Sequence, residues 1–440
     1  MAVEPFSFRA IPNNTNPRWF KDPSLKANIT HCVGLCLVIF YLGYDAGLLN
    51  GLQALESWNI FFNYPKGMIL GLYAATLYLP SVITAYIGDI ICQHFGRRIA
   101  LGIGSFLVLA GGLINALATN PAMWISGRVV IGSGGGLAKV AAPALIQEIA
   151  HPRLRPVLAS CYYPFFYFGT LLSALLCFAG LYIPGEWSWR MPSIVQIISP
   201  GVVLATLLSC PESPRWLVSK GQVSKAAEIL CKYHANGLPD DALVRWELTE
   251  IEAAIEGETT RHQNSYMDFL RSPGNRRRLW VLLSLCIGQN WVGNGVISYW
   301  PRYYAFYDIA WTPLPVSYTA EILPFGLRTK GLAIFTSVGT MANSFNQFVN
   351  PIALEALAWK YYAVYIAIMA FYLMFAYFMY PETRNHTVEE VSAVFDTKNS
   401  EELKEFALSE TERYFASDDT NSKEKKQHDS VGVSSHKEEI

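Results

Sequence analysis

The chain has 440 residues, of which 52% are hydrophobic and only 16% are charged, compared with about 25% charged residues in an average soluble domain. A formal net charge of −1 leaves no basic field for binding a nucleic acid. This composition favours a protein that lies in the lipid bilayer. The eight cysteines lie mostly in apolar runs without the spacing of a metal site or a disulfide framework, so we expect no metal and no cofactor.

A membrane crossing needs about 20 consecutive apolar residues, and ten such segments follow one another along the chain. The first six predict an N-terminal bundle over 28–210, and the last four predict a C-terminal bundle over 279–380. The predicted spans are 30–52, 68–88, 99–119, 122–142, 157–182, 192–210, 279–300, 305–325, 331–353 and 361–380. The fold class is therefore an all-α, multi-pass membrane protein.

Polar segments precede, separate and follow the two groups of spans. Residues 211–278 predict a central loop with surface helices at 222–235 and 240–257, rich in Lys, Glu and Ala. Residues 1–27 predict a short N-terminal segment, and the charged, Ser-rich residues 381–440 predict a largely disordered tail. Basic residues favour cytoplasmic loops, and those of the short loops all fall on one side if both termini are cytoplasmic.

An internal repeat relates the two halves. Glu148 is followed by Arg155, and Glu321 is followed at the same spacing by Arg328. A second acidic motif follows each of them at a similar distance, in P-E-S-P-R-W-L and in P-E-T-R-N. Two halves of one design are typical of transporters built from parallel six-helix repeats.

Eight motifs in order resemble the sugar porter family of the major facilitator superfamily, and within it the fungal hexose and lactose-permease-like members. The motifs are G-Y-D-A-G from Gly43, G-R-R from Gly96, G-R at Gly127, the Glu148 to Arg155 segment, W-S-W-R from Trp187, P-E-S-P-R-W-L from Pro211, the stretch from Gln289 to Gly293, and P-E-T-R-N from Pro381. The resemblance implies a major facilitator fold that carries a sugar. Where the family usually has an Asp before G-R-R, this chain has Gln93.

Two charges inside predicted spans are candidates for proton coupling. Asp45 and Arg128 both lie roughly 10 Å below the outer surface, at 1.5 Å per helical residue, so they can meet. A charge at that depth is costly and is usually paired or functional. One hypothesis is that Asp45 takes up a proton and releases Arg128, as the resemblance to proton-coupled relatives suggests. The alternative is a permanent structural ion pair.

Polar and aromatic side chains in the spans are candidates for binding the substrate. Gln289 and Asn290 match positions that bind sugar hydroxyls in the family, and an amide suits a polyol because it both donates and accepts hydrogen bonds. Asn343 offers a similar amide in a later span, and Tyr163, Tyr299 and Trp311 offer rings that could stack on a pyranose. For each of them the alternative is packing between helices. Lys139 receives no role.

Charged residues at the cytoplasmic ends of the spans are candidates for a gate that holds the halves together in one state and releases them in the other. We expect Glu148 to act with Arg155, Glu212 with Arg215, and Glu321 with Arg328; the alternative is anchoring at the membrane surface. The whole candidate set comprises Arg97, Arg98, Glu148, Arg155, Glu212, Arg215, Glu321 and Arg328.

The lengths of the two halves differ. Asn28 precedes Glu148 by 120 residues, whereas Arg278 precedes Glu321 by only 43, a shortfall of 77. That length corresponds to two spans of about 20 residues and their loops. We therefore predict that family helices 8 and 9 are missing and that the join lies near Tyr299 to Phe306.

These observations predict a plasma-membrane carrier that moves a hexose or a disaccharide by alternating access, driven by protons. Its partners would be the sugar, the proton and the lipid bilayer, with no nucleic acid and no obligate protein partner. The alternatives are a sugar sensor that no longer transports and a truncated or mis-spliced, inactive carrier. The sequence contains no phosphate loop and no nucleophile beside a base, so we do not expect an enzyme.

Overall fold

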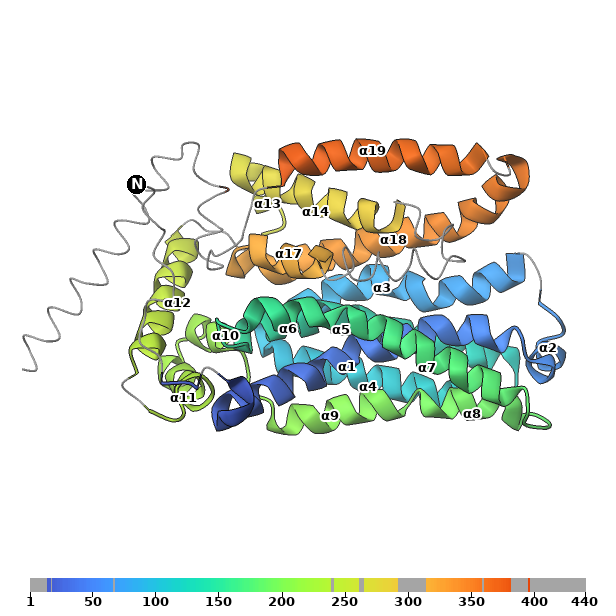
Figure 1. Cartoon of the computed structure of the whole chain (residues 1–440), viewed down its shortest axis with the longest axis horizontal. Helices are drawn as coiled ribbons and strands as arrows, with labels where there is room; N and C mark the ends of the chain where they lie inside the picture. Colours follow the sequence, from blue (N-terminus) through green and yellow to red (C-terminus); the bar gives the residue numbers. More distant parts are fainter. Residues whose placement is uncertain are drawn as a thin grey trace, which may run out of the picture.

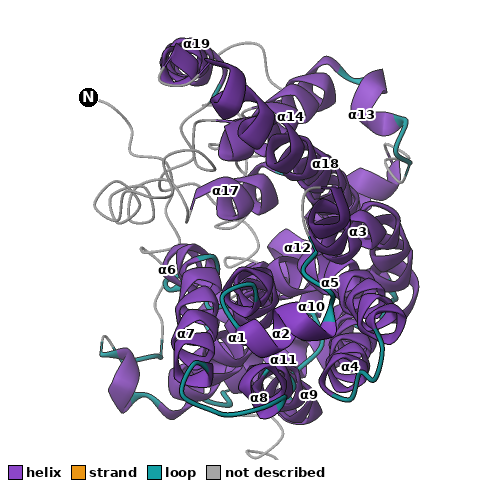
Figure 2. Ribbon diagram, turned by 90° about the vertical axis from the view of Figure 1, so that its right-hand side faces the viewer, coloured by secondary structure: helices purple, strands orange, loops and turns teal. Residues whose placement is uncertain are grey.

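The computed structural model describes residues 14–16, 18–65, 68–238, 241–260, 265–291, 314–357, 360–380 and 395. All regular secondary structure in this part is helical. The long helices run side by side along the long axis of the molecule (Figure 1). An end-on view separates a larger group, which includes α1, α4, α5 and α7, from a smaller group around α14, α18 and α19, with α3 next to α18 (Figure 2).

Six helical spans form the first group, and each coincides with a predicted span. They are α1 (Pro23–Leu52), α3 (Met68–Phe95), α4 (Arg97–Ala116), α5 (Pro121–Ile149), α6 (Arg155–Tyr162) continued by α7 (Pro164–Gly180), and α8 (Trp187–Val195) continued by α9 (Ile198–Ser209). All six are long and apolar enough to cross a bilayer. Helix α5 continues seven residues beyond the predicted end at 142, so Glu148 lies within the helix.

Glycines allow α5 to lie directly against its neighbour α4. A Cβ atom on Gly134 would lie 2.4 Å from the carbonyl oxygen of Gly104, and a Cβ on Gly104 would lie 2.8 Å from the carbonyl oxygen of Gly134. Neither position can carry a side chain unless the helices move apart. Close backbone approach of this kind is how helices associate in lipid, where no hydrophobic force drives them together.

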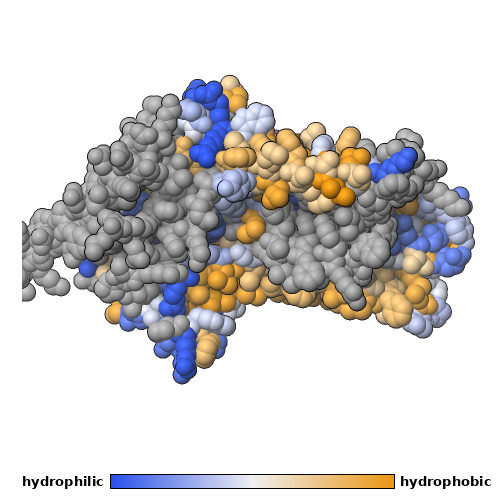
Figure 3. Space-filling view, turned by 45° about the horizontal axis from the view of Figure 1, so that its top comes forward, coloured by the Kyte–Doolittle hydropathy of each residue, from blue (hydrophilic) through white to orange (hydrophobic). Residues whose placement is uncertain are grey.

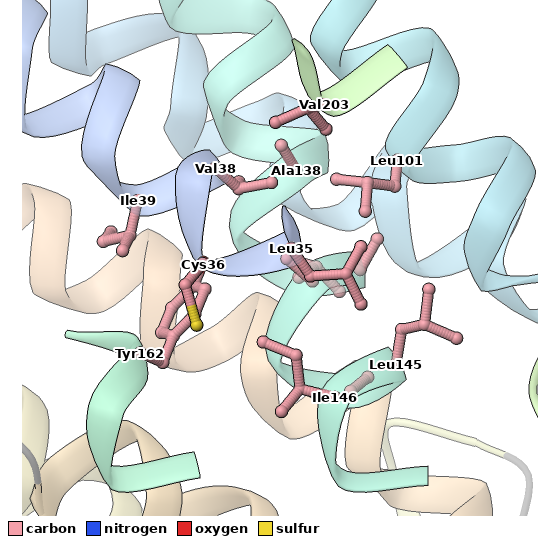
Figure 4. Close-up of a cluster of buried hydrophobic side chains, with 14 of the residues drawn as sticks. Leu35, Cys36, Val38, Ile39, Leu101, Ala138, Leu145, Ile146, Tyr162 and Val203 are labelled. Atoms are coloured by element: carbon pink, nitrogen blue, oxygen red, sulfur yellow. The ribbon is translucent and has the colours of Figure 1, made fainter. Parts of the chain in front are cut away.

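The interior of the first group is a continuous apolar core. Side chains from α1, α4, α5, α6 and α9 meet there, and fourteen residues of this cluster are drawn in Figure 4. Leu35 and Val38 of α1 face Ala138 and Leu145 of α5, and all four are almost fully buried. Helix α5 is thus the central element of the bundle, as expected for a span with little side-chain bulk.

A small helical segment lies at one end of the molecule. It comprises α10 (Pro214–Ser219), α11 (Val223–His234), α12 (Ala242–Thr260) and α13 (Asp268–Arg271), while the short helix α2 (Glu56–Phe61) lies at the opposite end (Figure 1). Helices α11 and α12 match the two predicted surface helices. His234 fixes the segment to the bundle: its Nδ1 lies 2.7 Å from Glu247 and its Nε2 lies 3.1 Å from the carbonyl oxygen of Ile149.

The second group contains four helices in the part of the chain that is described. They are α14 (Pro273–Trp291), α17 (Leu314–Ile322), α18 (Phe325–Leu357) and α19 (Tyr361–Met379). Helix α14 starts before the predicted residue 279, so Arg276 and its two neighbours lie in the helix rather than in a loop. The predicted join near Tyr299 to Phe306 lies outside the described residues, and so does the part of the predicted span 305–325 that precedes residue 314.

Apolar residues cover much of the surface of both groups. On the face drawn in Figure 3, hydrophobic residues cover the middle of the long axis and hydrophilic residues gather toward its ends. Helix α19 exposes large apolar residues along one whole side, among them Ile366, Phe371 and Tyr377. This distribution fits a molecule embedded in a bilayer, because such surface would be unfavourable in water.

Candidate functional site

A cavity of about 120 Å³ lies between the two groups of helices. Its lining combines aromatic rings, amides, hydroxyls and one lysine from both groups. The lining residues are Ile39, Tyr78, Lys139, Tyr162, Tyr163, Phe166, Gln289, Asn290, Leu332, Phe335, Thr336, Gly339, Thr340 and Asn343.

Four of the six residues predicted to bind the substrate line this cavity. Tyr163 lies in the break between α6 and α7, Gln289 and Asn290 lie near the end of α14, and Asn343 lies on α18. The other two, Tyr299 and Trp311, lie outside the described residues.

The amides at the end of α14 have different surroundings. The side chains of Tyr163 and Gln289 are hydrogen-bonded to each other across the two groups of helices. Asn290 instead donates its Nδ2 hydrogens to the backbone carbonyls of Cys286 and Gly339, at 2.9 and 3.2 Å. Asn290 therefore packs α14 against α18, whereas Gln289 joins the two halves at the cavity.

Asp45 and Arg128 lie near each other and are both almost fully buried. They interact electrostatically, and Tyr78 of the cavity wall takes part in the same interaction. Within the part of the chain that is described they form no hydrogen-bonded pair, since Asp45 Oδ1 and Arg128 Nε have no hydrogen-bond partner there. The Arg128 guanidinium lies over the ring of Trp124, 4.9 Å from its centroid.

Glu148 joins the two groups of helices at the end that carries α11. Its carboxylate lies 3.0 Å from Arg97 of α4 and 3.1 Å from Arg328 of α18, and Ser213 donates a hydrogen bond of 2.5 Å to it. Glu148 and both arginines are at most 2% exposed. One carboxylate binds two buried cations, and separating the groups at this end would break its contact with Arg328 while Arg97, which lies in the same group as Glu148, could stay in place.

Two arginines of the acidic motifs contact a carboxylate outside their own motif. Arg155 lies 3.8 Å from Glu247 of α12 and not beside Glu148. Arg328, expected beside Glu321, pairs with Glu148. The sequence spacing misled here because α5 ends at Ile149 and the chain then turns, which carries Arg155 away from Glu148.

Glu212, expected beside Arg215, caps the start of α4. Its carboxylate accepts hydrogen bonds of 3.1 Å from the backbone N–H groups of Arg97 and Arg98, where the positive end of the helix dipole favours an anion. Burial raises the pKa of Glu212, and the backbone N–H groups that bind it act in the opposite direction. Gly96 has a φ of 101°, and a Cβ there would lie 2.4 Å from Glu212, so this contact requires glycine.

Gln93 also links the two halves at this end. Its Nε2 donates to Asp89 at 2.7 Å and to Thr329 of α18 at 3.4 Å, and the Tyr266 hydroxyl donates to the other oxygen of Asp89 at 2.7 Å. These polar contacts connect α3 with α18 and with Tyr266 of the central segment.

The sequence reasoning missed Tyr78, Thr336 and Thr340 as cavity residues. The two threonines lie one helical turn apart on α18, and Gly339 and Asn343 continue the same face. These polar residues recur at helical spacing in an otherwise apolar segment, and this pattern in the sequence could have identified them as cavity residues. For Tyr78 we find no such signal, because its neighbours in α3 are apolar or aromatic as well.

Two helical bundles with a cavity between them, formed by facing spans, define a membrane carrier of the transporter class. The family model described as "Sugar (and other) transporter" matches residues 31–303 and 301–395. The chain belongs to this family, within the major facilitator superfamily. The match breaks into two pieces at 301–303, inside the predicted join. The chain thus has the major facilitator fold, with four helices in the described part of its second bundle.

Among curated proteins, the chain is 28% identical over 264 residues to high-affinity glucose transporter 1 of Candida albicans, covering 59% of this chain and 48% of that one. It is 32% identical over 236 residues to H(+)/hexose cotransporter 1 of Parachlorella kessleri, covering 49% and 42% respectively. The chain therefore spans about half the length of these relatives.

Among solved structures, it resembles the proton:xylose symporter XylE of E. coli bound to 6-bromo-6-deoxy-D-glucose. The TM-score is 0.74 at 21% identity, over 84% of this chain and 99% of that one. This likeness supports the assignment of the fold.

Proposed function

We propose that the chain is a secondary transporter that carries a sugar across the membrane by alternating access. The observation that carries this proposal is the cavity between the halves, lined by amides and rings, with the buried contact of Glu148 and Arg328 joining the halves at one end of the molecule. Separation of the halves at that end would require this contact to break. Arg98, Arg155, Glu212, Arg215 and Glu321 would form the outer part of this gate.

The proposed driving force is a proton gradient. Asp45 is buried, is not hydrogen-bonded to Arg128, and is linked to the cavity through Tyr78. A permanent structural pair would be expected to hold both groups in direct contact. The relatives named as proton cotransporters or symporters support the same assignment.

The variant Asp45→Asn is expected to lose proton-driven accumulation while keeping sugar binding, because an amide mimics a permanently protonated acid. The measurement is radiolabelled sugar uptake into proteoliposomes with and without an imposed pH gradient. The ratio of uptake with the gradient to uptake without it should fall to one in Asp45→Asn. In Asp45→Glu, which keeps a titratable group, the ratio should stay above one but below that of the parent chain. An unchanged ratio in Asp45→Asn would remove this residue from the coupling.

The variant Gln289→Ala is expected to weaken sugar binding about tenfold, since an unpaired polar group in a closed site costs about 1–3 kcal/mol. Equilibrium binding of labelled D-glucose measures this. The matched control is Gln196→Ala, which removes a buried amide that donates to Gly112 and lies away from the cavity. If the parent chain and Gln289→Ala bind D-glucose with equal affinity, Gln289 does not bind the sugar and serves in helix packing instead.

The proposed location is the plasma membrane, with both termini and the segment α10–α12 in the cytoplasm. A sensor that binds sugar without moving it has the same cavity, and a carrier made inactive by its missing helices has the same gate. Uptake of labelled sugars into cells that lack their own carriers separates transport from both alternatives. The proposal includes no enzymatic step.

A further inference from the structure

Lys139 is the cationic residue among the described residues that line the cavity. It lies on α5, eleven residues after Arg128. This spacing is about three helical turns, so the two residues lie on nearly the same side of the helix. The helix therefore directs both cations toward the interior of the molecule. Arg128 lies against Trp124 and near Asp45, whereas Lys139 is half-buried and borders the cavity itself.

The described part of the chain supplies no partner for this ammonium group. No hydrogen bond or ion pair joins Lys139 to a described residue, and none of the described lining residues is acidic. Two buried carboxylates of the first bundle are engaged elsewhere: Asp45 interacts with Arg128, and Glu148 with two arginines. A lysine in a membrane span usually pairs or faces a functional cavity, and among the described lining residues no acidic side chain compensates the charge of Lys139.

We propose that Lys139 makes this cavity selective for a polyol with one negative charge, such as a carboxylated sugar, over the corresponding neutral sugar. The inference rests on the proposed function and names its substrate class. Gln289, Asn343 and the two threonines of α18 offer hydrogen bonds to hydroxyl groups, and Lys139 offers a charge-assisted bond to a carboxylate, which is roughly twice as strong. The carboxylate also supplies a compensating charge that the described lining residues do not provide.

The test compares D-glucuronate with D-glucose, which share their ring stereochemistry and differ at C6, a carboxylate in one and a hydroxymethyl group in the other. Equilibrium binding of both labelled sugars is measured for the full chain in nanodiscs, for Lys139→Gln and for Lys139→Arg. We expect the parent chain to prefer D-glucuronate about tenfold or more. Lys139→Gln should abolish this preference, and Lys139→Arg should retain most of it.

Gln289→Ala is the companion variant, because it removes a hydroxyl contact and should weaken both sugars to a similar extent. If the parent chain binds D-glucose as tightly as D-glucuronate, the proposed selectivity is wrong, but the proposed function as a sugar carrier is not contradicted. A glucuronate preference that persists in Lys139→Gln assigns the preference to another residue and also overturns the proposal. Failure of the parent chain to bind either sugar contradicts the proposed function as well.

Discussion

The Glu148→Gln variant is expected to lose about 3–5 kcal/mol of stability, the usual cost of removing one partner from a buried ion pair. Glu148 is 0% exposed and neutralises Arg97 and Arg328, which come from the two halves. Glutamine keeps the shape of the side chain but not its charge, so both buried arginines would lose the carboxylate that they share. The measurement is thermal unfolding of the purified chain, together with the rate at which a thiol reagent labels the buried Cys92.

The matched control for this experiment is Glu186→Gln. Glu186 also pairs with an arginine, Arg190, at 2.9 Å, but its side chain is 60% exposed. Exposed pairs contribute about 0–1 kcal/mol, so this variant should unfold like the parent chain and leave Cys92 protected. If Glu148→Gln behaves in the same way, the Glu148 contacts do not hold the two halves together.

Insertion of a two-helix segment near residue 302 is expected to raise concentrative sugar uptake on the order of tenfold over the 440-residue chain. The second bundle has four helices in its described part, and α19 exposes one whole side. An incomplete bundle populates the transport-competent arrangement for a smaller fraction of the time, and apparent affinity falls in proportion to that fraction. The inserted segment would be helices 8 and 9 of the Candida albicans relative.

Uptake into liposomes would be compared among the parent chain, this chimera and a chimera that carries two helices of an unrelated membrane protein. The unrelated helices lengthen the chain without restoring the contacts of the bundle, so this control should transport as weakly as the parent. Concentrative uptake by the 440-residue chain at the level of the matched chimera would show that the missing helices are dispensable.

The sequence by itself determined the six spans of the first bundle, the two surface helices and the family. These features are encoded locally, because a run of about 20 apolar residues specifies a crossing wherever it packs. The spacing between motifs also located the missing helices near Tyr299 to Phe306, and the break in the family match at 301–303 agrees with that position. Gln289 could be selected as a cavity residue for a similar reason, since its motif fixes its place within a span.

Only the tertiary structure decided which charges meet. Glu148 has Arg155 seven residues away in the sequence, yet it pairs with Arg328, which is 180 residues away. Electrostatic contacts form between side chains that the packing of helices brings together. The distance in space between two such side chains cannot be read from their spacing in the sequence. The same holds for Lys139, to which the sequence assigned no role: α5 places it at a cavity whose other wall belongs to the second bundle.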